Sequence, residues 1–130
     1  MKVSEVMTKN PEVINAGENV LSAAKRLADK DIGALPVEKD DRLIGILTDR
    51  DIVVRLIAGQ RDPAGTQVED IISPLVKYCF EDEDVSHVAS NMDQLLVRRL
   101  PVVDRRKRLV GILSIEDIRP RRRSAAPSLG

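Results

Sequence analysis

The sequence has few of the residue types that catalytic centres and base-stacking surfaces use. Its 130 residues include one cysteine, one histidine, one tyrosine, one phenylalanine and no tryptophan. Because Cys79 has no second cysteine to pair with, an internal disulfide is excluded and nothing indicates an oxidising compartment. With Tyr78 and Phe80 as the only aromatic residues, we expect an aliphatic core, and an exposed aromatic platform for nucleic-acid bases is nearly excluded.

The chain also lacks an excess of charge and a long apolar run. It carries 21 basic and 21 acidic residues, but four of the arginines lie in the last twelve residues, which contain no acid. The preceding 118 residues therefore hold 17 bases and 21 acids, so we expect no nucleic-acid partner. No stretch approaches about 18 consecutive apolar residues, and "MKVSEVMTKN" has charges where a signal peptide needs an apolar run. We expect a cytoplasmic protein without a membrane partner.

No catalytic or metal-binding constellation is predicted. His87 follows "FEDED" in a helical stretch and is interpreted as a surface or capping residue. Cys79 lies in an apparent strand, which favours a buried and unreactive thiol. The acidic run at residues 81–84 is compatible with a cation site, but it reads more simply as charge that complements a helix dipole. The sequence therefore predicts neither an enzyme nor a required cofactor.

What the sequence does contain is an internal duplication. A constant shift superimposes the first half on the second until "EKDDR" (38–42), which is answered by the longer "VDRRKR" (103–108), and beyond this stretch the shift grows by one. Because the length change falls in a polar stretch, it predicts a hairpin loop there. The paired positions include Val3 with Val68, Val6 with Ile71, Thr8 with Ser73, Val20 with Val85, Ala24 with Ala89, Leu27 with Met92, and Leu35-Pro36-Val37 with Leu100-Pro101-Val102.

Each copy predicts the order strand, helix, strand, strand, helix. In the first copy we expect a short strand at 12–14, and a helix at 18–30 with Val20, Ala24 and Leu27 on one face. Extended segments at 34–37 and 43–47 follow, and then a helix that stops at Gly59. In the second copy Pro120 cuts the last helix short.

These elements predict one α/β body made of two βαββα units with pseudo-twofold symmetry, since one unit alone has too few apolar residues to cover its helices. The predicted bounds are 1–60 for the first repeat, 61–66 for a linker, 67–118 for the second repeat and 119–130 for a basic, disordered tail.

The repeated heptads "GILTDRD" (45–51) and "GILSIED" (111–117) carry the functional prediction. Each places a hydroxyl three residues before an aspartate at the start of a helix. One interpretation is a capping box that only stabilises the helix. The other is a nucleoside phosphate site, because strand-to-helix junctions attract phosphate and an acid one turn later can accept bonds from ribose hydroxyls. Gly45 and Gly111 would let the backbone approach such a ligand closely.

The chain resembles a tandem pair of cystathionine β-synthase (CBS) domains, or Bateman module. The resemblance covers nearly residues 1–118 and rests on Val6-Met7-Thr8, "GALPV", "RRLPVVD" and the two heptads, all in order and twice. It implies two βαββα repeats packed as an α/β (α+β) module, a homodimer of modules, and adenosine-type ligands in clefts between the repeats. AMP, ADP or ATP are the expected ligands, with S-adenosylmethionine or NAD ranked behind them.

The resemblance also assigns roles to individual residues. Asp51 and Asp117 would hold the ribose hydroxyls, and Thr48 and Ser114 would help to place phosphates. The remaining predicted contacts are Gly33, Ala34, Arg98, Arg99, Thr8, Val13, Ser73 and Tyr78. Arg98 and Arg99 are expected either to contact phosphate or to remain solvated or paired with acids such as Asp49. Since the arginines occur in the second copy alone, the two sites are expected to differ in affinity.

The expected function is a regulatory module that senses an adenosine compound and signals to an unidentified protein target through the packing of its dimer. The alternative is a ligand-free, dimeric adapter in which the heptads only cap helices. A fragment of the family's enzymes, such as IMP dehydrogenase, is a third reading, but the chain has no room for a catalytic barrel.

Overall fold

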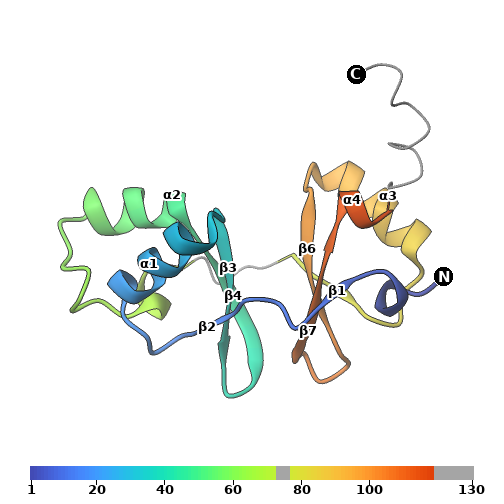
Figure 1. Ribbon diagram of the computed structural model, residues 1–130, viewed down its shortest axis with the longest axis horizontal. Coiled ribbons are helices and arrows are strands. Elements are labelled where there is room, and N and C mark those ends of the chain that lie inside the picture. The colour runs from blue at the N-terminus through green and yellow to red at the C-terminus, as the bar shows by residue number, and fades with distance from the viewer. Residues whose placement is uncertain (73–76, 119–130) are drawn as a thin grey trace. The chain divides into compact units, whose positions relative to one another are not determined.

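The computed structural model describes residues 1–72 and 77–118. In this part the chain forms two compact units, each a β-sheet with helices gathered on one face (Figure 1). We call Glu12–Val76 the contiguous unit. We call Met1–Pro11 together with Lys77–Gly130 the split unit, because its two pieces are far apart in the sequence. The predicted tail at 119–130 lies outside the described residues.

The contiguous unit has a three-stranded sheet in the order β2-β3-β4, with β2 parallel and β4 antiparallel to β3. Its elements are β2 (Ile14–Asn15), α1 (Val20–Lys30), β3 (Ala34–Lys39), β4 (Arg42–Thr48), α2 (Asp49–Asp51), η2 (Ile52–Ile57) and η3 (Val68–Asp70).

The split unit repeats this order and adds a fourth strand, giving β1-β7-β6-β5. Its elements are η1 (Val3–Glu5), β1 (Thr8–Lys9), β5 (Cys79–Phe80), α3 (Val85–Leu95), β6 (Arg99–Val103), β7 (Leu109–Ser114) and α4 (Ile115–Ile118). The predicted α/β fold class and the βαββα order are therefore confirmed.

Helix α1 shows how the local sequence sets the element. Asn19 caps its amino end by accepting a hydrogen bond from the Ser22 N–H at 2.8 Å. The buried stripe consists of Val20, Ala23 and Leu27. The prediction had Ala24 in place of Ala23; Ala24 is only half-buried, because positions three and seven residues after Val20 face the core more directly in a 3.6-residue period.

The two hairpins differ in length where the duplication predicted they would. The β3–β4 turn consists of Asp40 and Asp41, both with positive φ (52° and 65°), as a two-residue turn of type I′ requires. The β6–β7 connection runs from Asp104 to Arg108 and is closed by a bond from the Asp104 N–H to the Arg108 carbonyl at 3.0 Å. The predicted loop is confirmed.

The helix predicted at 49–59 is only partly α-helical. After Asp49–Asp51 the chain continues as a π-helix, η2, in which the Ala58 N–H donates to the Val53 carbonyl five residues earlier at 3.0 Å. Over so short a stretch the spacing of apolar side chains cannot separate a 3.6-residue turn from a wider one, so the sequence pattern missed the change. In the second copy α4 is described as far as Ile118, so the helix end predicted at Pro120 lies outside the described residues.

Each unit is completed by a segment from outside its own sequence repeat: the split unit by residues 1–11, and the contiguous unit by the stretch that contains Thr66 and Val68. In the split unit, the Val3 N–H donates to the Glu83 carbonyl and the Val85 N–H donates to the Met1 carbonyl, both at 2.9 Å. In the contiguous unit the duplicated counterparts make the same bonds: Val68 N–H to the Glu18 carbonyl at 2.8 Å, and Val20 N–H to the Thr66 carbonyl at 2.9 Å. The compact units therefore do not coincide with the predicted repeats, because residues 1–11 belong to the split unit and the contiguous unit begins at Glu12 and includes Val68.

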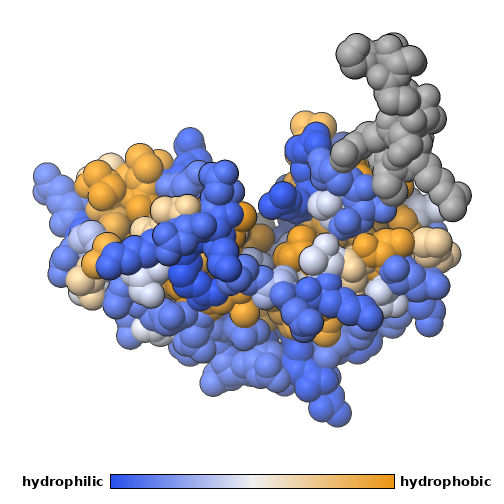
Figure 2. Space-filling view, in the orientation of Figure 1, coloured by the Kyte–Doolittle hydropathy of each residue, from blue (hydrophilic) through white to orange (hydrophobic). Residues whose placement is uncertain are grey.

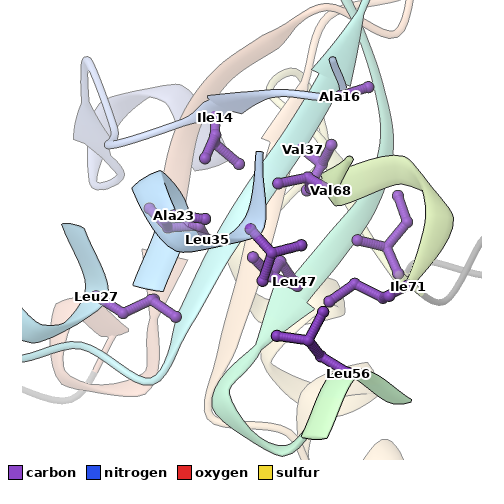
Figure 3. Packing of buried hydrophobic residues seen from close by; sticks show 12 residues of the cluster. Ile14, Ala16, Ala23, Leu27, Leu35, Val37, Leu47, Leu56, Val68 and Ile71 are labelled. Atoms are coloured by element: carbon purple, nitrogen blue, oxygen red, sulfur yellow. The ribbon is translucent and has the colours of Figure 1, made fainter. Parts of the chain in front are cut away.

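The exchanged segments contribute to the two aliphatic cores. Val68 and Ile71 reach the contiguous core beside Val37 and Leu56 (Figure 3). Val3 occupies the corresponding place in the split core with Val88 and Met92. Val3 and Val68 are both 0% exposed. Full burial of one valine stabilises a fold by about 1.5–3 kcal/mol, so neither core is complete without its segment.

Candidate functional site

Both heptads lie at the junction between the last strand and the last helix of a unit. Thr48 ends β4 and Ser114 ends β7, and each is followed directly by a helical turn. The predicted strand-to-helix junction is confirmed in both copies. Each junction belongs to one of the two units, so the candidate residues fall into two groups, one for each unit.

In the contiguous unit, Thr48 and Asp51 form a capping box. The Asp51 N–H donates to the Thr48 hydroxyl oxygen at 3.0 Å, and the Thr48 N–H donates to Oδ2 of Asp51 at 2.9 Å. The capping interpretation is therefore confirmed here. The capping bond leaves Asp51 able to accept further hydrogen bonds, because an ionised carboxylate offers about four acceptor sites on its two oxygens.

In the split unit the arrangement is similar but not identical. The Ser114 N–H donates to Oδ2 of Asp117 at 3.0 Å, which is the acid's half of a capping box. The Ser114 hydroxyl instead interacts with Glu116. The pKa of Glu116 is lowered, first by its own backbone N–H, then by the Arg98 guanidinium and by Ser114. Glu116 was not predicted as a site residue; its place inside the second heptad was the signal that could have found it.

The residues that precede the Leu-Pro-Val strands are brought to these junctions. The Asp49 N–H donates to the Gly33 carbonyl at 3.0 Å, and the Ile115 N–H donates to the Arg98 carbonyl at 2.9 Å. The next residue in each unit lies opposite the heptad hydroxyl in the strand ladder, Ala34 opposite Thr48 and Arg99 opposite Ser114. The structure thus groups these predicted residues in each unit, in the same register.

The alternative readings of the arginines are partly resolved. Nη2 of Arg98 lies 2.9 Å from Oε1 of Glu116, so this side chain is paired with an acid, although not with Asp49. Arg99 is exposed. An Arg–carboxylate pair at the surface contributes roughly 0–1 kcal/mol, so an incoming phosphate could replace Glu116 at small cost.

Of the four residues predicted to contact the base, the structure describes Thr8, Val13 and Tyr78. Thr8 pairs with Ile112 of β7, so it belongs to the split unit and to the same sheet as Ser114. The Val13 carbonyl already accepts a bond from Arg26 Nη2 at 2.8 Å. The exposed Tyr78 ring has Lys107 Nζ 5.3 Å from its centroid and meets Phe80 edge-on at 5.7 Å. Ser73 lies outside the described residues.

Gly111 has a different role from the one predicted. A Cβ at this position would lie 2.6 Å from Sδ of Met7 and 2.9 Å from the Thr8 carbonyl oxygen. The close approach that glycine permits is therefore the approach of β1 to β7, and not the approach of a ligand to the backbone.

Two hollows in the described surface lie away from the predicted residues. One, of about 240 Å³, is lined by residues that include Lys2, Phe80 and Arg105 of the split unit. The other, of about 400 Å³, lies at the amino end of α1 in the contiguous unit, between Asn19 and Gln67. Neither is lined by a predicted ligand residue.

The residues set aside as non-catalytic have ordinary structural roles. Cys79 is buried, and burial together with the charge of Glu83 raises the pKa of its thiol to about 12. His87 is exposed and meets Asn91 at 3.3 Å. Asp84 caps α3 by accepting from the Ser86 N–H at 3.0 Å, so the acidic run does complement a helix end. Among residues 1–72 and 77–118, no group of three or more His, Cys, Asp or Glu is arranged to hold a metal ion.

Comparison with known proteins shows one consistent family. The CBS domain model matches residues 3–58 and again residues 68–122. Hypoxic response protein 1 of Mycobacterium tuberculosis is 36% identical over 120 residues, which cover 86% of this chain and 83% of the relative. A crystal structure of that protein, described with two coordinated zinc ions, superimposes with a TM-score of 0.81 at 32% identity, covering 93% of this chain and 98% of the other.

Two further solved structures contain adenosine compounds. The CBS domain pair of protein MJ0100, in complex with 5′-methylthioadenosine and S-adenosyl-L-methionine, has a TM-score of 0.76 and 31% identity, over 96% of this chain and 98% of the other. CBSX2 in complex with AMP has a TM-score of 0.77 and 27% identity, over 99% and 98%.

Proposed function

Because this chain belongs to the CBS-domain family and consists of a tandem pair of CBS domains, we propose that it is a non-catalytic regulatory module that binds adenosine-containing ligands. The proposed ligands are AMP, ADP or ATP, and S-adenosylmethionine or NAD rank behind them. The site residues are those grouped at the two strand-to-helix junctions: Gly33, Ala34, Thr48 and Asp51 in one unit, and Arg98, Arg99, Ser114 and Asp117 in the other.

One observation carries this proposal. In each unit the acid at the end of the heptad accepts a backbone N–H through Oδ2, at 2.9 Å for Asp51 and 3.0 Å for Asp117, and no residue that the structure describes bonds to its other carboxylate oxygen. The bond fixes the carboxylate in one orientation, and its other oxygen keeps the acceptor capacity that the two hydroxyls of a ribose need. A prealigned acid loses less conformational entropy when a ligand arrives. The cap and the ligand site are therefore compatible.

The proposed mechanism of regulation is a change in assembly. Val53, Val54 and Ile57 on η2 are 60%, 48% and 60% exposed, which is unusual for three neighbouring aliphatic side chains. Figure 2 shows the resulting apolar cluster at its upper left. We propose that this face joins modules into a homodimer, and that a ligand which favours one arrangement of the dimer signals to a separate protein target.

We further propose a cytoplasmic location, because the lone Cys79 gives no internal disulfide. No helix in the described part of the chain is long and apolar enough to cross a membrane.

A ligand-free adapter remains the second candidate, and the Thr48–Asp51 capping box is the observation that favours it. In that case the heptads serve the fold alone, and the apolar face of η2 serves partners without a small-molecule signal.

Thermal unfolding with and without nucleotides separates the two candidates. Wild type is melted with AMP, ADP, ATP, S-adenosylmethionine and NADH, beside the double variant Asp51→Asn, Asp117→Asn. Asparagine keeps an oxygen for the capping bond but replaces the second acceptor with an NH₂ group. We expect a ligand at about 100 times its dissociation constant to stabilise wild type by about 2.7 kcal/mol, and to have no effect on the double variant. If none of the five compounds shifts the wild-type transition, the adapter is the correct function.

A further inference from the structure

The two junctions carry different charges at corresponding positions. The side chains that differ are Gly33 and Ala34 against Arg98 and Arg99, Asp49 against Ile115, and Arg50 against Glu116. Because the backbone bonds at the two junctions are the same, these side chains occupy equivalent places around Thr48 and Ser114. The chemical difference between the sites therefore comes from these side chains.

At the contiguous junction, an acid occupies the region where the split unit has an arginine. Oδ2 of Asp49 would lie 3.5 Å from a Cβ placed on Gly33, the counterpart of Arg98. Oδ1 of Asp49 accepts from the Arg50 N–H at 2.8 Å, so the carboxylate is held in place. A phosphate near Thr48 would meet this negative charge, and like charges brought together disfavour binding.

At the split junction, the balance is reversed. Arg98 and Glu116 neutralise each other at 2.9 Å. Arg99, opposite Ser114 in the β6–β7 ladder, is exposed and makes no ion pair with any residue that the structure describes. Among the described residues, Arg99 is therefore a cation without an ion pair on the residue opposite the heptad hydroxyl, and its forked donors suit phosphate oxygens.

We propose that the two sites select ligands of opposite charge at the 5′ position. The split unit takes 5′-phosphorylated adenosine compounds through Arg99, and the contiguous unit takes adenosine compounds whose 5′ group is neutral or cationic, because Asp49 repels phosphate. This inference rests on the proposed function, since it assumes that both junctions bind adenosine.

The test uses chains with one working site. Asp51→Asn disables the contiguous site and Asp117→Asn disables the split site, and both keep the capping acceptor. Calorimetric titration then compares adenosine with AMP on each chain. We expect the Asp51→Asn chain to bind AMP at least about tenfold more tightly than adenosine, and the Asp117→Asn chain to prefer adenosine by about the same factor. Raising the salt concentration should reduce both preferences.

A second substitution in each chain assigns the preference to a residue. Arg99→Gln, added to Asp51→Asn, should remove the AMP preference, so that AMP and adenosine bind this chain with similar affinities. Asp49→Asn, added to Asp117→Asn, should strengthen AMP binding severalfold. Arg106→Gln and Asp40→Asn are the matched controls, because they make the same charge changes in the turns at the opposite ends of the two hairpins.

The outcomes distinguish this inference from the function on which it rests. If wild type binds neither adenosine nor AMP, the proposed function is wrong and the inference falls with it. If both single-site chains bind with the same preference, or if Arg106→Gln changes the AMP preference as much as Arg99→Gln does, the binding function stands and the charge selectivity is overturned.

Discussion

The contiguous unit and the split unit share backbone bonds but differ in side chains. In both, the segment that completes the core makes its hydrogen bonds at duplicated positions, with donor–acceptor distances of 2.8–2.9 Å. In both, the backbone N–H of the first helical residue in the heptad, Asp49 or Ile115, donates to the carbonyl of the residue just before the Leu-Pro-Val strand, Gly33 or Arg98. Around this shared frame, the hairpin loop and the charges at the junction have both changed. A duplicated fold thus keeps its main-chain bonds and diverges where side chains face solvent or a ligand.

The acids of the two units show the same divergence. In the split unit the pKa values of Asp82, Asp84, Asp104 and Glu116 are lowered. In the contiguous unit, Glu12 is the described acid with a lowered pKa, through Arg26 and Lys30. Carboxyl groups with a lowered pKa are therefore more numerous in the described part of the split unit.

The largest expected effect comes from charging an exchanged segment. Val3→Asp and Val68→Asp each put an unpaired carboxylate into a fully buried position, and should cost about 3–5 kcal/mol of unfolding free energy. Hydrogen exchange should show loss of protection in α3 for Val3→Asp and in α1 for Val68→Asp. Leu21→Asp, at a site on α1 that is 40% exposed and lies outside the apolar face of η2, is the control and should change stability little. Loss of protection in α1 caused by Val3→Asp would contradict the assignment of the segments.

Gly111→Ala should have the next largest effect. The new methyl group would lie 2.9 Å from the Thr8 carbonyl, which is backbone and cannot turn aside. We expect a loss of about 1–3 kcal/mol in a denaturant titration, with weakened β1–β7 pairing. Gly33→Ala is the matched control, since its Cβ would meet Asp49 at an ordinary 3.5 Å. Equal losses at the two glycines would show that close packing of β1 is not the cause.

A smaller effect, of the opposite sign, is expected at the end of α3. Leu96 caps this helix with a φ of 57° and is 90% exposed, a conformation that leucine adopts at a cost of about 1–2 kcal/mol. Leu96→Asn should therefore raise the free energy of unfolding by about 1 kcal/mol. Its counterpart Asp31 has the same conformation, with a φ of 52°, but is a residue that tolerates it better. Asp31→Asn should consequently change stability by only a few tenths of a kcal/mol; an equal gain at both positions would refute the explanation.

The smallest expected effect is a difference in acid sensitivity. A carboxyl whose folded pKa is lowered adds stability that is present above its unfolded pKa, near 4, and is lost as the pH falls through the folded value. With four such acids against one, protection of the split unit should fall first as the pH drops below about 4. Hydrogen exchange at stepwise lower pH measures the pH at which each unit loses protection. Arg105→Gln removes the partner of Asp82 and should bring these two pH values closer together. Simultaneous loss in both units, unchanged by Arg105→Gln, would contradict the prediction.

Much of the fold could be predicted because it depends on local pattern. The Leu-Pro-Val segments, the apolar runs after them and the one-residue growth of the repeat shift located the strands and the variable loop. The exchange of segments could not be predicted in this way. Val3 and Val68 look alike in the sequence, and nothing near either residue says that one packs against a helix far ahead of it and the other against a helix far behind.

The candidate site was predictable in part for a similar reason. The junction residues follow from the heptads and from the register of two neighbouring strands. Glu116 was missed because its importance depends on which way one side chain turns after β7, where it meets Arg98. The close approach at Gly111 was attributed to a ligand, because a glycine in a sequence indicates that its backbone is approached closely but does not show by which group. In the structure that group is β1.

The exchange of segments also has a consequence for synthesis on the ribosome. Once residue 72 has emerged, the contiguous unit has every described part that it needs. The split unit cannot finish until residues near 114 appear, although Val3 and Thr8 were made first. These residues therefore stay without their partners while most of the chain is translated. If they form wrong contacts during that time, folding of the split unit is impaired.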